Sequence, residues 1–192
     1  VRLEPENVDY VGNRAEARGS SGDLEGALQD YGRVLELEPG SWSGRHGRGR
    51  TLVALGRWAE ALPDLDGALD RHPDHVESRV SRAVARHRTG NEVGAIEDSS
   101  RAIEVDPGRA DGWLVRGNVH QALQRDADAR RDFEQAVAIA PDTWQAWIGL
   151  IGTRALEGDA GGAEEAAAQA LRCAPPEVRP EIERRRRKYL GR

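Results

Sequence analysis

Histidine and cysteine are the side chains with which this sequence could hold a metal or attack a substrate. His72 and His75 stand three residues apart, a spacing that suits a metal ion when both residues lie on one helix. They flank Pro73, and a proline there favours a loop between helices. Cys173 closes an apolar segment, where cysteine is more often a small packing residue than a nucleophile. We therefore predict no metal site and no catalytic residue.

The run from Gly44 to Arg50 alternates glycine with arginine and histidine, which superficially suggests a phosphate loop or an RNA-binding tract. A phosphate loop follows a strand and ends in Lys-Ser or Lys-Thr, and the run has neither feature. The run falls inside a segment with helical periodicity, so we interpret it as a helix weakened by glycine. The chain is thus predicted to be no enzyme and to need no cofactor.

Composition excludes further classes of function. The 192 residues have a mean hydropathy of -0.69, and no stretch reaches the roughly 20 apolar residues of a membrane-spanning helix. The 33 acidic residues outnumber the 28 basic ones, which argues against a general nucleic-acid binder. A single cysteine forbids an internal disulfide, so we expect a cytoplasmic protein. Every basic residue except Lys188 is arginine, which we attribute to a GC-rich bacterial genome.

The residues that would shape the helices around any functional site recur every 34 positions. Proline marks the end of each period without an insertion. Alanine recurs twelve residues before each of these prolines, where a small side chain lets two helices approach closely. The two series are Pro39, Pro73, Pro107, Pro141 and Pro175, and Ala27, Ala61, Ala95, Ala129 and Ala163.

Each period contains two segments with helical periodicity, at about 42–55 and 59–70 in the second unit. Glycine followed by an N-capping residue separates them, as at Gly22-Asp23, Gly90-Asn91 and Gly158-Asp159. Gln124 replaces this glycine in the fourth unit. The pattern predicts about eleven helices and no strand.

The repeat resembles the tetratricopeptide repeat (TPR) family over nearly the whole chain. The fourth unit carries the resemblance best, although Arg45 in the second unit departs from the family's bulky apolar preference. The resemblance implies an all-α superhelix, a right-handed solenoid of antiparallel helix pairs. The matching residues of the fourth unit are Trp113, Gly117, Ala129, Phe133, Ala136 and Pro141.

We expect one solenoid domain over residues 1–192 with five repeats and a C-terminal capping helix. Residues 1–7 are interpreted as the remnant of a preceding repeat, which predicts a fragment of a larger bacterial protein. The basic run from Arg184 to Lys188 suits the C-terminal end of the capping helix, with nucleic acid or acidic lipid as its alternative contact. The predicted repeats are 8–41, 42–75, 76–109, 110–143 and 144–177, followed by the cap at 178–192.

In such a stack the first helices line an inner groove, so we predict that the groove binds a peptide or a partner helix. Its basic middle, with Arg50 and Arg88 beside two histidines, favours an acidic partner, whereas Leu114 and Ile148 favour an apolar anchor. Histidine protonation below roughly pH 6.5 is expected to strengthen the acidic preference. The predicted groove residues are His46, Arg50, Val84, His87, Arg88, Leu114, Asn118, Gln121 and Ile148.

Three functions remain open at this point. The first is a non-catalytic protein–protein interaction scaffold, and the second is a regulatory TPR domain of a multidomain enzyme. The third is nucleic-acid binding through arginine. The polar groove residues could also do no more than solvate a concave face. The sequence leaves the partner and the oligomeric state open.

Overall fold

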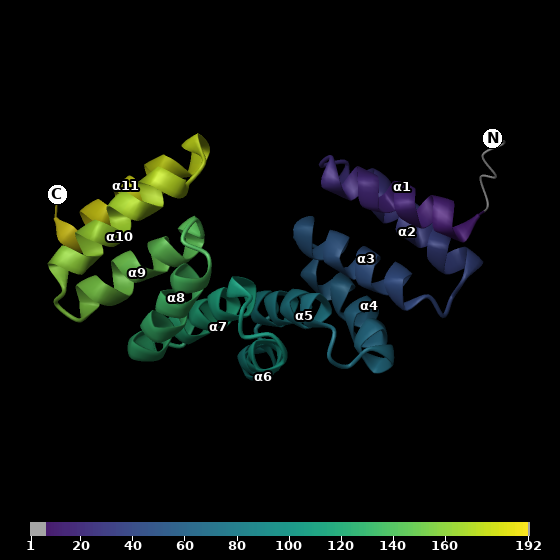
Figure 1. Ribbon diagram of the computed structural model, residues 1–192, viewed down its shortest axis with the longest axis horizontal. Coiled ribbons are helices and arrows are strands. Elements are labelled where there is room, and N and C mark those ends of the chain that lie inside the picture. Colours follow the sequence, from purple (N-terminus) through teal and green to yellow (C-terminus); the bar gives the residue numbers. More distant parts are fainter. Residues whose placement is uncertain (1–6, 192) are drawn as a thin grey trace. The chain divides into compact units, whose positions relative to one another are not determined.

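The computed structural model describes residues 7–191 as helices joined by short turns (Figure 1). Eleven α-helices and one 3-10 helix occupy these residues, and none of residues 7–191 adopts a strand. The predicted all-α class is therefore confirmed. The helices are α1 (Val8–Ser20), α2 (Leu24–Leu37), α3 (Trp42–Ala54), α4 (Trp58–Arg71), α5 (Val76–Arg88), α6 (Glu92–Val105), α7 (Ala110–Ala122), α8 (Asp126–Ile139), α9 (Trp144–Leu156), α10 (Ala160–Cys173), η1 (Pro176–Val178) and α11 (Arg179–Leu190).

Each 34-residue period forms one helix pair, and a left-handed residue makes the turn inside it. Four of these residues are glycines with φ between 74° and 89°, namely Gly22, Gly56, Gly90 and Gly158. Glycine reaches this region without steric cost because it has no Cβ. Gln124 adopts the same conformation in the fourth pair, at φ 58°. The turn geometry is thus kept where the glycine is lost, at the expense of backbone strain.

The capping residues predicted after three of these turns begin the second helices. A side-chain oxygen of Asp23, Asn91 and Asp159 accepts a hydrogen bond from the amide three residues later, at 3.0, 3.0 and 2.8 Å. Each bond satisfies an amide that has no partner within its own helix. The glycine-plus-cap pattern therefore locates these helix starts correctly.

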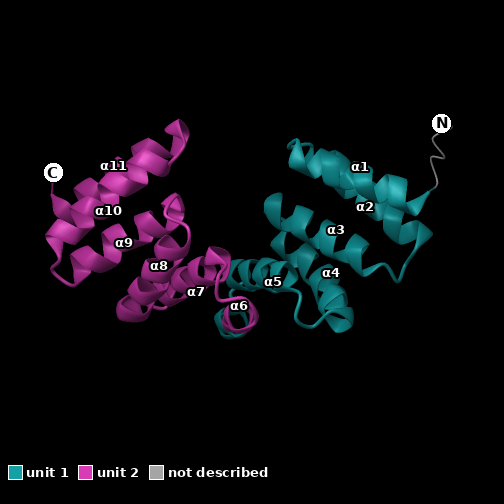
Figure 2. Cartoon of the chain, viewed as in Figure 1, with its two compact units in different colours: residues 1–98 teal, residues 99–192 magenta. Residues whose placement is uncertain are grey.

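The chain divides into two compact units, residues 1–98 and 99–192, and the boundary along the chain falls inside α6 (Figure 2). The single solenoid domain and its repeat bounds stay predictions. Of the expected remnant at residues 1–7, residues 1–6 lie outside the described part of the chain, and Asn7 is the N-cap of α1.

In the first unit, the glycine-rich run of α3 lies against large side chains of α2 and α4. A Cβ at Gly47 would lie 2.2 Å from the Tyr31 ring, and one at Gly49 would lie 2.8 Å from Leu65 Cγ. Tyr31 and Leu65 are both buried. Close packing therefore requires the glycines, and the interpretation of the run as a helix is confirmed.

In the second unit, Phe133 of α8 likewise packs against glycines of the neighbouring helices. Its ring lies where a Cβ at Gly117 or Gly149 would come within 2.7 or 2.3 Å of it. Helix α11 packs on α9 and α10 and buries Ile182 completely. The predicted capping helix is therefore present, although it starts at Arg179 after the 3-10 turn η1.

An ion pair joins the two helices of each of the first four pairs at equivalent positions. Arginine of the first helix donates two hydrogen bonds of 2.6–2.9 Å to an aspartate sixteen residues later on the second helix. The aspartates are nearly buried, with side-chain exposures of 2–6%. Leu150 and Ala166, both fully buried, replace the pair in α9 and α10. The four pairs are Arg14–Asp30, Arg48–Asp64, Arg82–Asp98 and Arg116–Asp132.

Candidate functional site

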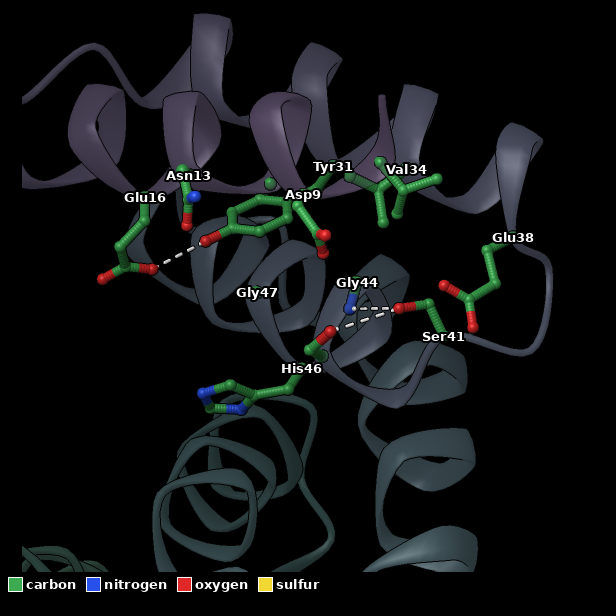
Figure 3. Close-up of a pocket in the computed structure, with 13 residues that line it drawn as sticks. Asp9, Asn13, Glu16, Tyr31, Val34, Glu38, Ser41, Gly44, His46 and Gly47 are labelled. Atoms are coloured by element: carbon green, nitrogen blue, oxygen red, sulfur yellow. Dashed lines mark hydrogen bonds between the residues drawn. The ribbon is translucent and has the colours of Figure 1, made fainter. Parts of the chain in front are cut away.

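A pocket of about 330 Å³ opens in the first unit on the predicted inner faces of α1 and α3 (Figure 3). Helix α1 supplies Asp9 and Glu16, α2 supplies Tyr31 and Val34, and α3 supplies His46. Its other lining residues are Val8, Gly12, Asn13, Glu38, Ser41, Ser43, Gly44 and Gly47.

Glu16 is the most heavily bonded group of this pocket. Its carboxylate accepts a hydrogen bond of 2.7 Å from the Tyr31 hydroxyl (Figure 3). It also accepts two bonds of 2.8 Å from Arg50 Nη2. The bonds from Arg50 and Tyr31 lower the pKa of Glu16. Burial and the bond to Glu16 raise the pKa of Tyr31 to about 12. The carboxylate is thus held ionised, and Arg50 neutralises it.

Two further carboxylates give the pocket an acidic character. Asp9 and Glu38 line it, and within residues 7–191 neither side chain has a hydrogen bond or an ion pair. Val8 and Val34 add apolar surface to the same lining. The pocket can therefore accept a cationic group beside a small apolar one.

The residues expected to form a basic cluster each have a separate partner. Arg50 pairs with Glu16, and His87 Nδ1 lies 2.7 Å from a carboxylate oxygen of Glu92. The guanidinium of Arg88 lies 5.4 Å above the Trp58 ring, at cation–π distance. The structure thus shows Arg50 as one half of an ion pair rather than as an unpaired cation.

The pKa of His46 lies far below its ordinary value. Burial, followed by the neighbouring His75 and Arg50, lowers its pKa to about 4, and Glu77 only partly opposes this shift. An unperturbed imidazole would become protonated below roughly pH 6.5, and for His46 this expectation is therefore wrong. The imidazole stays neutral because only 13% of the side chain is exposed.

The remaining predicted groove residues differ in what they can offer a partner. Asn118 is exposed on α7, and Gln121 and Val84 are half-buried. Leu114 is half-buried and packs on the core of the second unit. Ile148 belongs to that core and is only 6% exposed, so it presents little surface as an apolar anchor.

A second hollow of about 440 Å³ lies along α7 and α8 in the second unit. The Arg116–Asp132 ion pair forms part of its wall, and the Arg116 guanidinium lies 4.9 Å from the Trp113 ring. His120 Nδ1 lies 3.1 Å from Asp132 Oδ2 without hydrogen-bonding geometry. Most of its polar groups are engaged within the wall, so the first-unit pocket offers more unpaired charge.

The pocket's central contact carries a signal that could have revealed it from the sequence. Glu16 and Arg50 are one 34-residue period apart, on equivalent positions of consecutive first helices. Opposite charges at equivalent positions of adjacent helices are expected to pair. The Glu16–Arg50 pair becomes evident only when equivalent positions of consecutive repeats are compared.

Two family models match the chain, and both describe tetratricopeptide repeats. One covers residues 46–110 and the other residues 110–143. Together they run through about half of the sequence. Among helices in residues 7–191, none has the length and apolar character needed to cross a membrane.

Two curated relatives align with part of the chain. Sperm-associated antigen 1 of Rattus norvegicus is 29% identical over 86 residues, which is 43% of this chain and 10% of that protein. The Mus musculus protein of the same name is 30% identical over 86 residues, 9% of its length. The chain thus spans about a tenth of these relatives.

Solved structures share the fold over nearly the whole chain. A thermophilic TPR protein of Thermus thermophilus superposes with a TM-score of 0.75 at 21% identity, covering 97% of this chain and 100% of that one. MamA gives 0.70 at 20% identity, with 95% and 94% covered. YrrB, described as a TPR protein with an unusual peptide-binding site, gives 0.67 at 19% identity, with 94% and 93% covered.

Proposed function

Because the chain belongs to the tetratricopeptide repeat family, we propose that it is a non-catalytic scaffold that binds a peptide or a partner helix on its first helices. Proteins of this family bind protein partners, and repeated helix pairs present their first helices as an extended binding surface. The observation that carries the proposal is the pocket between α1 and α3, because it lies on the predicted inner positions.

The chemistry of the pocket narrows the segment that it would accept. Asp9 and Glu38 provide two carboxylates, and Val34 provides apolar surface between the helices. A lysine or arginine side chain next to a small apolar residue complements this lining. We propose such a segment as the group bound by the first unit.

The preference for an acidic partner, expected from the arginines, applies to the surface around Arg88 and not to the pocket. An acidic group of the partner would have to displace Glu16 from Arg50. Arg88 is exposed, and within residues 7–191 its side chain pairs with the Trp58 ring and with no carboxylate. We therefore propose Arg88 as the contact for an acidic partner residue. A peptide carrying both charges satisfies both sites.

Arginine-mediated nucleic-acid binding has less support from the C-terminal helix. Arg185 pairs with Glu181, and Arg186 pairs with Glu164 and Glu183. These contacts neutralise part of the basic run that would have to meet phosphates.

A screen of short peptides varying in charge, followed by titration of the best binder, tests the proposal. Asp9→Asn and Glu38→Gln should each weaken a basic peptide about two- to fivefold, as expected for partly exposed ion pairs. The matched control is Asp70→Asn, which removes an exposed carboxylate from the second helix α4. If the control weakens binding and the two pocket variants do not, the partner uses the other face and the proposal is refuted.

A further inference from the structure

Three side chains that favour metal ions converge in the first unit. His46 lies in the second turn of α3, His75 is the N-cap of α5, and Glu77 lies in the first turn of α5. One potential ligand atom from each of them lies within 4.8 Å of the other two. His46 Nε2 is 3.6 Å from Glu77 Oε2, and the two imidazole centroids are 4.6 Å apart.

We propose that His46, His75 and Glu77 bind a divalent transition-metal ion such as Zn²⁺. Ligand bonds of about 2.0–2.1 Å around a tetrahedral ion place neighbouring ligand atoms roughly 3.3 Å apart. The distance between His46 and Glu77 is already close to that value. Glu77 has a 43% exposed side chain, so a change of rotamer can bring its carboxylate to an ion without moving a helix.

A buried hydroxyl contacts the Nδ1 side of both imidazoles. Ser78 is fully buried, and its Oγ lies 2.9 Å from the Nδ1 atoms of both His46 and His75. A hydroxyl oxygen can accept two hydrogen bonds, so both Nδ1–H groups can donate to it. Each Nε2 then carries a lone pair for the metal. An acceptor placed in this way orients metal-binding histidines and fixes their tautomer.

Binding has a cost at the helix start. The Ser78 amide donates a 3.3 Å hydrogen bond to His75 Nδ1, which caps α5 while that nitrogen is unprotonated. Metal binding at Nε2 requires the other tautomer and gives up this long bond. The N-terminal end of a helix also disfavours a cation, and the charge of Glu77 offsets this effect.

The donor set selects the kind of ion. Two imidazoles and one carboxylate suit Zn²⁺, Co²⁺, Ni²⁺ or Cu²⁺, whereas Ca²⁺ and Mg²⁺ prefer oxygen ligands alone. Three protein ligands leave a fourth position for water or for a side chain of a partner. Because His46 also lines the acidic pocket, the ion would place positive charge at its edge.

Nearby residues provide both a reporter and a control. The Trp42 ring lies 6.2 Å from the His46 ring and 5.1 Å from the His75 ring, close enough for a bound paramagnetic ion to quench its fluorescence. The centroid of the His72 ring lies 4.3 Å from that of Trp42, with the two rings tilted, but His72 does not belong to the three-residue cluster. The site therefore combines His75 with His46, from the preceding first helix, instead of with His72.

The test is calorimetric titration of the purified chain with Zn²⁺, and with Co²⁺ for its absorption spectrum. We expect one ion per chain and a Co²⁺ spectrum typical of tetrahedral coordination. His46→Ala, His75→Ala and Glu77→Gln should each lower the affinity at least about tenfold. Ser78→Ala should lower it about ten- to hundredfold while keeping all three ligands. His72→Ala should bind like the original chain.

Circular dichroism of each variant checks that the helices are intact. The isosteric change Glu77→Gln, at a partly exposed side chain, keeps the test valid if a histidine variant unfolds. The proposal is overturned if the unaltered chain fails to bind Zn²⁺ at millimolar concentration. It is also overturned if His72→Ala removes binding while His46→Ala retains it. No partner is needed, so the outcome is independent of the peptide-binding proposal.

Discussion

The Arg48–Asp64 pair allows a quantitative test of how the repeats are held together. Asp64 has a side-chain exposure of 6%, and Arg48 donates bonds of 2.7 and 2.8 Å to its two oxygens. Asp64→Ala leaves a guanidinium without its anion against the partner helix. Removing one partner of a buried pair costs about 3–5 kcal/mol. Because 35% of the Arg48 side chain is exposed and can regain water, we expect a loss of about 2–3 kcal/mol.

The fifth helix pair provides the matched control for this variant. Leu150 and Ala166 occupy the positions equivalent to Arg48 and Asp64, so the double variant Arg48→Leu/Asp64→Ala copies a combination that the chain already uses. Replacing a buried ion pair with apolar residues is often neutral or stabilising. We expect the double variant to recover most of the lost free energy of unfolding in urea denaturation followed by circular dichroism. Equal losses in the single and double variants would refute the reasoning.

Three further predictions concern local features. Gly47→Ala forces a Cβ against the Tyr31 ring and should lower the free energy of unfolding by about 1–3 kcal/mol. Its control is Gly32→Ala, which has no atom near the new Cβ and should be neutral or stabilising; thermal melts compare the two variants. Gln124→Gly should raise the stability by about 1 kcal/mol because it relieves a left-handed residue, and an unchanged urea midpoint would contradict this. The folded-state pKa of His46 is about 4, below its usual 6.5, so stability is present above pH 6.5 and falls as the pH drops toward 4. The loss, up to about 3 kcal/mol, should shrink in His46→Asn when both proteins are titrated with a metal chelator present.

The helix boundaries were predictable because they depend on local chemistry. Proline, left-handed glycine and a capping Asp or Asn each act on their own few residues, and the prolines recur in all five periods, whereas the glycine is present in four and the cap in three. The second unit shows this: helices expected at about 42–55 and 59–70 are found as α3 (Trp42–Ala54) and α4 (Trp58–Arg71).

Side-chain pairing across the repeat was harder to predict. The Arg14–Asp30 type of ion pair recurs with the period and could have been recognised by comparing units. The partners of Arg50 and His46 lie on neighbouring helices, so they depend on how one pair stacks on the next. Composition and spacing along one helix do not contain that information. For this reason the sequence predicts an unpaired basic cluster, and it offers no neighbour of His75 except His72, with which a metal site is not predicted.

The change from an ion pair to Leu150 and Ala166 affects how such a chain can lengthen or shorten. Each of the first four helix pairs carries its own arginine and aspartate, so duplicating or deleting one whole period there keeps every internal pair intact. The fifth pair is packed by α11 and has lost both charges. A unit inserted after it would separate that apolar pair from its covering helix. Gain or loss of a whole repeat should therefore be tolerated before residue 144 and should be destabilising after it.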